Sequence, residues 1–186
     1  MTAAATSAAP RTTMLDRSRA ALVVVDVQEA FRKAVPDFEE IARRAAILVE
    51  GARILGIPAI VTEQYPQGLG HTVDEVGLDG ETVIEKTVFA ASCADGFDLG
   101  ERSQAIVCGI EAHVCVHQTV EDLTAKGVEV HLCADAIASR DPGNKAVALE
   151  RAERAGAVPT TVEMALLELC GRAGTGEFKA IQRLIK

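Results

Sequence analysis

Short runs of β-branched residues alternate with amphipathic helical patterns along almost the whole chain. The continuous run at residues 21–25 predicts a strand buried on both faces, because such strands carry few polar side chains. From Phe38 onward, apolar residues recur at intervals of three and four, which predicts an amphipathic helix that ends at Gly56. Alternation of this kind predicts a parallel sheet that helices cover on both faces.

The same patterns divide the rest of the chain into strands and helices. Strands are expected at residues 21–25, 58–61, 82–84, 105–108, 128–132 and from residue 157. Helices are expected at residues 38–55, 114–126, 144–155, 162–170 and 177–185. We therefore predict an α/β fold, a Rossmann-like three-layer α/β/α sandwich around a mainly parallel sheet of about six strands.

Length and charge limit the classes of protein to which the chain can belong. Its 186 residues and 19.6 kDa predict one domain, which we place at residues 20–186. The 27 acidic and 19 basic side chains give a net charge of −8, and this field repels phosphate backbones and anionic lipid. Apolar stretches fall far short of the roughly 20 residues of a membrane span. We therefore expect neither nucleic acid nor a membrane as a partner.

Residues 1–19 are rich in Ala, Thr and Ser and carry three arginines. We expect a flexible N-terminal tail here, with a transit peptide as the open alternative, because the apolar block of an export signal is missing. The five cysteines are an odd number and lie in apolar or loop segments. This usage favours reduced thiols and predicts a cytoplasmic protein.

Charged side chains follow several expected strands, and parallel sheets bind ligands beyond the carboxyl ends of their strands. Asp26 directly follows residues 21–25, and it is either the N-cap of the next helix or an active-site carboxylate. Lys86 follows residues 82–84 closely, and its ammonium either extends into solvent or is a fixed cation near Asp26. The residues alone leave both alternatives open.

Cys115 is the favoured nucleophile, because it lies where the fourth expected strand turns into a helix. The positive end of the helix dipole predicts a lowered thiol pKa at this position. Cys93, in the loop segment ASCADG, is the competing candidate. The remaining cysteines fit inert positions in strands or at a helix end, namely Cys108, Cys133 and Cys170.

His113 and His117 are four residues apart and would share one face of a helix. Two ordinary polar contacts are favoured over a shared metal ion, since the chain has neither an HExxH nor a CxxC motif. Walker A and GxGxxG motifs are missing as well. We therefore expect no metal and no cofactor. Whether His71, His113 or His117 contributes to a pocket stays open.

The candidate residues lie in segments that together resemble one known family. These segments are VVVDVQEAF (23–31), IPAIVTEQYPQGLGHT (57–72), EKTVFAASCADGF (85–97), IVCGIEAHVCVHQTVEDL (106–123), VHLCADAIASR (130–140) and GAVPTTVEMALLEL (156–169). With EFKAIQRLIK at the C-terminus, the chain resembles the isochorismatase-like cysteine hydrolases, and most of all the isochorismatase domain-containing group. The resemblance covers essentially everything after residue 19.

The resemblance implies a catalytic triad of Asp26, Lys86 and Cys115. It also implies a cis peptide bond between Ile110 and Glu111. Such a bond would aim the backbone amides of Glu111 and Cys115 at one point and form an oxyanion hole.

The resemblance further implies a substrate pocket with aromatic residues. Phe31 lies where family members often place a pocket aromatic, and Tyr65 and Phe89 are expected beside it, with Phe97 as a further candidate. Packing in the core is the alternative for each of these side chains.

The implied activity is hydrolysis of a carbon–nitrogen bond in a small amide or ureide, through a thioester on the cysteine. Vinyl-ether hydrolysis of the isochorismate type, and a non-catalytic binding protein that retains the fold, are the alternatives. Nicotinamidases of the family carry an Asp-x-His-type metal site where this chain has TEQYP (62–66), so nicotinamidase activity is not expected. We expect a small-molecule substrate and a homo-oligomer, a dimer or higher.

Overall fold

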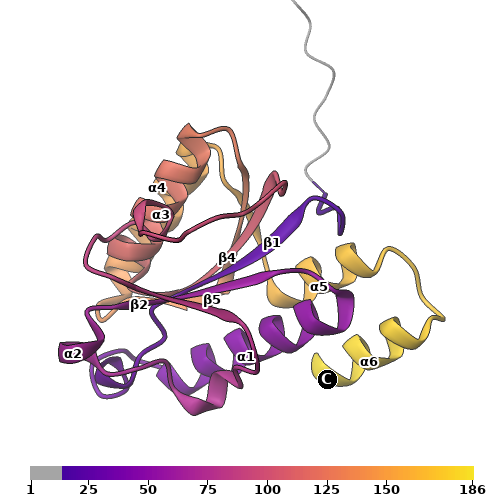
Figure 1. Ribbon diagram of the computed structural model, residues 1–186, viewed down its shortest axis with the longest axis horizontal. Coiled ribbons are helices and arrows are strands. Elements are labelled where there is room, and N and C mark those ends of the chain that lie inside the picture. The colour runs from indigo at the N-terminus through magenta and orange to yellow at the C-terminus, as the bar shows by residue number, and fades with distance from the viewer. Residues whose placement is uncertain (1–13) are drawn as a thin grey trace, which may run out of the picture.

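Six parallel strands form one sheet with helices on both sides in the computed structural model, which describes residues 14–186 (Figure 1). The strands are β1 (Ala20–Val25), β2 (Ala59–Gln64), β3 (Thr82–Lys86), β4 (Gln104–Ile110), β5 (Glu129–Ala138) and β6 (Val158–Thr160). Their order in the sheet is β3-β2-β1-β4-β5-β6, and every neighbouring pair is parallel. The expected α/β/α sandwich is confirmed.

The helices alternate with these strands along the chain. They are α1 (Phe38–Leu55), α2 (Pro66–Leu69), α3 (His117–Ala125), α4 (Pro142–Ala155), α5 (Val162–Cys170) and α6 (Gly176–Leu184). Short 3-10 turns lie at η1 (Glu29–Phe31), η2 (Asp74–Val76) and η3 (Ala91–Cys93), and a π-helical turn, η4, spans Ala112–Val116.

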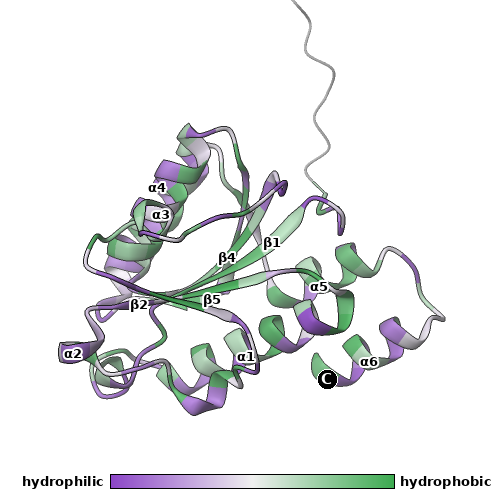
Figure 2. Ribbon diagram, in the orientation of Figure 1, coloured by the Kyte–Doolittle hydropathy of each residue, from purple (hydrophilic) through white to green (hydrophobic). Residues whose placement is uncertain are grey.

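The central strand β1 shows how the sequence builds the layers. All six of its residues are buried, as the continuous apolar run predicts. Leu22 and Val24 belong to the core that lies under α1, α5 and α6. Val23 and Val25 belong to the core that lies under α3 and α4. Because successive side chains of a strand point to opposite faces, one apolar run supplies both cores. Figure 2 shows hydrophobic colour along the middle of the sheet and mixed colour on the helices.

Local signals in the sequence decide where the helices begin and end. Gly56 ends α1 in a left-handed conformation, with φ at 65°, and its N–H bonds back to the last turn. The Asp141 side chain accepts a hydrogen bond from the Gly143 N–H, and Pro142 occupies the first turn, so α4 begins at Pro142 rather than at the expected residue 144.

Part of the expected N-terminal tail packs against the domain. Leu15 is buried in the core under α1. The Arg19 carbonyl accepts hydrogen bonds from the N–H groups of Ser103 and Gln104, each at 3.0 Å. Residues 14–19 are therefore continuous with the folded domain, whereas residues 1–13 lie outside the described residues.

The strand order reverses between β1 and β4. Ligands of open α/β sheets bind beyond the carboxyl ends of the strands that flank such a point. The residues that follow β1 and β4 are Asp26 and the turn at Glu111–Cys115, which carry the expected chemistry. Among residues 14–186, no helix is long and apolar enough to cross a membrane.

Candidate active site

Asp26 lies at the carboxyl end of β1 and is fully buried. Its Oδ1 accepts a hydrogen bond from the Thr62 hydroxyl at 2.7 Å, and its N–H donates to the Thr62 carbonyl at 3.1 Å. The N-cap of the following 3-10 turn is Gln28, so the N-cap interpretation of Asp26 is wrong. Its backbone is left-handed, with φ at 54°, a conformation that is uncommon for non-glycine residues.

Lys86 is the last residue of β3, and its side chain has no exposed surface. Its Nζ donates to Asp26 Oδ2 at 2.7 Å, to Gln64 Oε1 at 2.7 Å and to the Phe89 carbonyl at 3.1 Å. The alternative of an ammonium that extends into solvent is therefore wrong. Lys86 and Asp26 form a buried ion pair across the ends of β3 and β1.

Cys115 lies in the π-helical turn between β4 and α3 and is 5% exposed. Its thiol interacts with both Asp26 and Lys86, and Sγ lies 4.0 Å from Gln64 Oε1. The three residues that the resemblance implies as a triad therefore come together from β1, β3 and the turn after β4. Cys93, the competing candidate, is exposed and does not join this group.

The pKa of the Cys115 thiol is raised rather than lowered, which corrects the expectation from the helix dipole. Burial and the Asp26 charge raise the pKa of Cys115 to about 12, and the Lys86 charge opposes them only in part. Burial also raises the pKa of Asp26, while Lys86 and the Thr62 hydroxyl act in the opposite direction. Desolvation outweighs the helix terminus here because the thiol lies within the turn and beside a carboxylate.

Gly109 allows the backbones around the ion pair to come close together. A Cβ atom at this position would lie 2.0 Å from the Val25 carbonyl oxygen, directly before Asp26. The residue also has φ at 131°, which side chains rarely allow. Only glycine therefore fits in β4 opposite the last residue of β1.

Gln28 and Gln64, which the sequence did not indicate as site residues, bond to each other at the end of β2. Gln28 is fully buried, and its Nε2 donates to the Gln64 carbonyl at 3.0 Å and to the Gly70 carbonyl at 2.6 Å. Its Oε1 accepts from the Gln64 N–H at 2.8 Å. The sequence signal that could have identified Gln28 is its amide side chain two residues after Asp26, within the largely apolar segment VVVDVQEAF.

The turn that carries Cys115 forms without a cis peptide bond. No peptide bond in residues 14–186 is cis, so the expected cis bond between Ile110 and Glu111 is wrong. The trans form is more stable by about 3–4 kcal/mol at a non-proline residue, and the π-helical turn reverses the chain direction instead. The Glu111 carboxylate pairs with Arg140 and lies 3.1 Å from His113 Nδ1.

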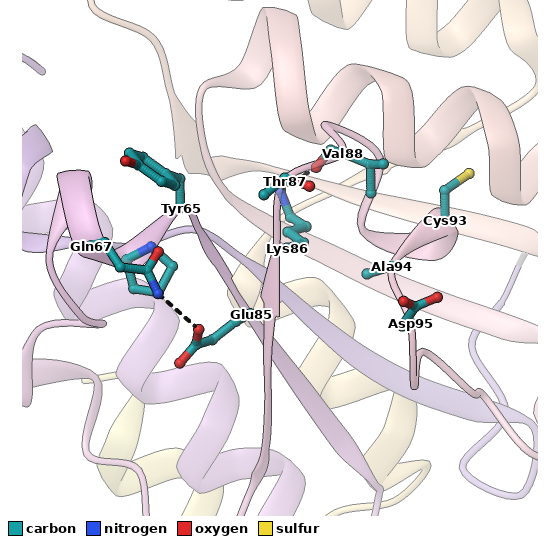
Figure 3. Close-up of a pocket in the computed structure, with 10 residues that line it drawn as sticks. Tyr65, Gln67, Glu85, Lys86, Thr87, Val88, Cys93, Ala94 and Asp95 are labelled. Carbon is teal, nitrogen blue, oxygen red and sulfur yellow. Dashed lines mark hydrogen bonds between the residues drawn. The ribbon is translucent and has the colours of Figure 1, made fainter.

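A cavity of about 330 Å³ lies at the Lys86 end of the site. Figure 3 shows Tyr65 and Glu85 on one side of Lys86, with Cys93 and Asp95 on the other. Of the expected pocket aromatics, Tyr65 lines this cavity, whereas Phe31 packs against the core under α1. Phe89 is half-exposed and contributes its carbonyl to Lys86.

The histidines have separate partners. His71 bonds to Glu63 at 2.9 Å and His113 to the Ser139 hydroxyl at 3.0 Å, while His117 lies 3.5 Å from Glu121. A metal ion shared by His113 and His117 was the alternative interpretation of their spacing. Residues 14–186 contain no group of three or more His, Cys, Asp or Glu side chains arranged to hold a metal ion.

Comparisons with known proteins identify the family. Residues 20–164 match the model of the isochorismatase domain. The chain is 46% identical over 167 residues to isochorismatase domain-containing protein 1 of Salmo salar. The aligned residues are 87% of this chain but only 59% of that protein. It is 42% identical over 168 residues to isochorismatase domain-containing protein 2 of Homo sapiens, and the aligned residues are 89% of this chain and 82% of that protein.

A solved structure has a similar fold and a similar sequence. The structure of MAR1 ribonuclease from Caenorhabditis elegans superposes with a TM-score of 0.89 at 40% identity, and the match covers 92% of each chain. The resemblance expected from the motifs is confirmed, and the chain belongs to the isochorismatase family.

Proposed function

We propose that this protein is a cysteine hydrolase that cleaves a carbon–nitrogen bond in a small amide or ureide. The single observation that carries the proposal is the buried Asp26–Lys86 ion pair beside the Cys115 thiol. A buried ion pair stabilises a fold poorly, because removing two charges from water offsets most of their attraction. Beside a thiol, however, the pair supplies a proton acceptor and a fixed cation, which are the two groups that nucleophilic attack requires.

The raised thiol pKa decides how the attack begins. With a pKa of about 12, Cys115 is protonated at neutral pH and has to lose its proton as it attacks. Asp26 takes this proton, and its raised pKa makes it a stronger base than an exposed carboxylate. The Lys86 ammonium stabilises the negative charge that develops on sulfur. The sulfur then bonds to the substrate carbonyl carbon.

The later steps return the enzyme to its starting state. The backbone amides of Glu111, at the start of the π-helical turn, and of Cys115, within it, are our proposed donors to the carbonyl oxygen as it gains negative charge. Asp26 gives its proton to the departing nitrogen, the carbon–nitrogen bond breaks, and a thioester remains on Cys115. Water attacks the thioester and loses a proton to Asp26, which passes it to the departing sulfur, so that the acid is released and the thiol restored.

The cavity limits the size and charge of the substrate. A volume of about 330 Å³ suits a small molecule, and Lys86, which lines the cavity, also acts on the Cys115 thiol. Glu85 and Asp95 line the same cavity, and their carboxylates disfavour anionic substrates. A neutral or cationic amide or ureide fits this lining.

One structural relative is named a ribonuclease, but we do not propose ribonuclease activity for this chain. The net charge of −8 opposes RNA binding, and the carboxylates of the cavity would repel a phosphate. Incubation with RNA, in parallel with the amide panel, tests this exclusion. Degradation of RNA that requires Cys115 would contradict the proposed substrate class.

The proposed reaction is tested by incubating the protein with a panel of amides and ureides and measuring released ammonia. We expect Cys115→Ala to lower turnover by about a thousandfold or more, since the nucleophile is lost. Cys93→Ala, which removes the competing, exposed thiol, is the matched control and retains turnover, because Cys93 is not the nucleophile of the proposed reaction. Activity that persists in Cys115→Ala would refute the nucleophile, and cleavage of a vinyl ether alone would favour the second chemistry.

The alternative of a non-catalytic binding protein predicts a different result in the same assay. A binding protein that retains the fold would give neither ammonia nor an acyl adduct on Cys115 with any compound of the panel. The homo-oligomer and the cytoplasmic location stay predictions, and light scattering after size-exclusion chromatography measures the first.

A further inference from the structure

Gln64 joins the ion pair to the thiol. Its Oε1 accepts a hydrogen bond from Lys86 Nζ at 2.7 Å and lies 4.0 Å from Cys115 Sγ. The register of the sheet creates this contact, because Gln64 and Lys86 are directly paired at the ends of β2 and β3. Side chains of paired residues in neighbouring strands point to the same face of the sheet.

The orientation of this amide is fixed from several sides. Gln64 Nε2 donates to the Thr87 carbonyl at 2.9 Å, which leaves Oε1 to face the ammonium. The backbone of Gln64 is held as well, because the Gln28 side chain bonds to both its N–H and its carbonyl. The oxygen beside Lys86 is therefore preorganised before any substrate arrives.

The closest acceptors of the Lys86 ammonium are Asp26 Oδ2, Gln64 Oε1 and the Phe89 carbonyl, and the Val88 carbonyl lies farther away at 3.4 Å. Of these, Gln64 Oε1 is an uncharged side-chain acceptor that also lies beside the Cys115 sulfur. Without it, the acceptors left to the ammonium are Asp26 and the backbone carbonyls of Val88 and Phe89. We propose that Gln64 is a positioning residue whose side-chain oxygen keeps the Lys86 ammonium beside Cys115.

Other charges near the turn do not take over this task. Asp26, after β1, and Lys86, in β3, act on the thiol directly, with opposite signs. The remaining charged and titratable groups around the turn pair with one another, as Glu111 with Arg140 and His113, and Glu121 with His117 and Arg151. In the part of the chain that the structure describes, Lys86 is the cation that lowers the pKa of Cys115.

The test compares Gln64→Met with Gln67→Met. Methionine resembles glutamine in length but lacks the oxygen that Lys86 requires. Gln67 lines the same cavity, is exposed and bonds to Glu85, so its replacement leaves Lys86 untouched. The readout is the pH dependence of Cys115 alkylation by iodoacetamide, followed by peptide mass spectrometry.

The midpoint of alkylation lies near the thiol pKa of about 12, so the variants are compared on the limb below it, where the rate rises about tenfold for each pH unit. We expect Gln64→Met to displace this limb by about one unit to higher pH, which lowers the rate about tenfold at every pH along it. Gln67→Met leaves the limb unchanged. Gln64→Asn is a second variant that retains the amide but withdraws its oxygen by one carbon, and it displaces the limb in the same direction. Because methionine also raises the pKa by desolvating the thiol, Gln64→Asn decides between the two causes: a folded Gln64→Asn with the wild-type limb would overturn the positioning role.

The inference rests on the proposed function for its catalytic meaning, but the two fail separately. Alkylation needs no substrate, so a displaced limb without turnover of amides or ureides would keep the positioning role and refute the reaction. Turnover that is unaffected in Gln64→Asn, together with an unchanged limb, would refute the positioning role and keep the reaction. Where turnover is measured, the role of Gln64 predicts a lower kcat with a nearly constant KM, because Lys86 acts on the nucleophile rather than on substrate binding.

Discussion

Lys86 Nζ lies 2.7 Å from Asp26 Oδ2, and the two side chains are 0% and 1% exposed. Apolar residues of similar volume often stabilise a core at least as well as such a pair. Asp26 also has a left-handed backbone, which adds strain at the same point. Two unfavourable features at the end of one strand indicate that this position serves chemistry rather than stability.

The first prediction concerns the loss of one partner from this pair. Lys86→Met leaves the Asp26 carboxylate buried without a cation, and we expect the free energy of unfolding to fall by about 3–5 kcal/mol at pH 7. Urea denaturation followed by circular dichroism measures it. The double variant Asp26→Asn/Lys86→Met is the control, because it removes both charges and should regain part of the lost stability. Equal stability of the single and double variants would contradict a coupled pair.

The second prediction concerns Gly109. Gly109→Ala places a Cβ atom 2.0 Å from the Val25 carbonyl oxygen, so the ends of β1 and β4 have to separate. We expect a loss of more than about 3 kcal/mol in the free energy of unfolding, as for severe backbone clashes. Gly77→Ala is the matched control, since Gly77 also has a positive φ, at 70°, but a Cβ atom there meets nothing within 4 Å. Similar losses in both variants would show that strain in φ, rather than close approach, explains the cost.

Elements with a clear repeat were predicted to the residue. Helix α1 spans Phe38–Leu55 because its apolar residues keep one face on the core and Gly56 then ends it. Strand β2 was expected to end at residue 61 but extends to Gln64. Its last residues are polar, and the pattern of hydrophobicity does not reveal that Thr62 and Glu63 are buried through hydrogen bonds.

The residues of the candidate site also divide into those that the sequence reveals and those that it does not. Asp26, Lys86 and Cys115 were candidates because each follows or ends an expected strand, and parallel strands bring their ends together. The residues alone left the roles of Asp26 and Lys86 open, and the family resemblance implied the triad. Gln28 and Gln64 act through hydrogen bonds to backbone and ammonium, which depend on the register of β2 and β3 and have no periodic signature. The thiol pKa was predicted in the wrong direction, because the sequence reveals the helix terminus but not the depth of burial.

The third prediction concerns the pH dependence of stability. The pKa of Cys115 is about 12 in the folded protein and 9.0 for an ordinary thiol, so the folded state retains the proton that the unfolded state loses. The resulting stability is fully present below pH 9 and is lost as the pH rises toward 12.

Between pH 8.5 and 10, we expect the free energy of unfolding of the wild type to fall by about 1 kcal/mol more than that of Cys115→Ala. Urea titrations at a series of pH values measure this difference. The other buried thiols, Cys108 and Cys133, are present in both proteins and cancel. Parallel curves for the two proteins would contradict the raised pKa.

The last prediction concerns the hydroxyl that holds Asp26. Thr62 Oγ1 donates to Asp26 Oδ1 at 2.7 Å, and this bond favours the ionised carboxylate. Thr62→Val keeps the shape of the side chain and removes the donor, so the pKa of Asp26 should rise further, by about one unit for a hydrogen bond to a charged group.

If Asp26 is the base, the acidic limb of the rate profile moves to higher pH in Thr62→Val by the same amount, because the base has to be ionised before it accepts the thiol proton. Titration of the Asp26 carboxyl carbon by NMR measures the shift without a substrate. Thr160→Val, at a buried threonine in β6 far along the sheet from Asp26, is the control and leaves both quantities unchanged. A shifted carboxyl titration with an unshifted acidic limb would show that Asp26 is held by Thr62 but is not the base, and proton transfer would then have to be assigned to another group.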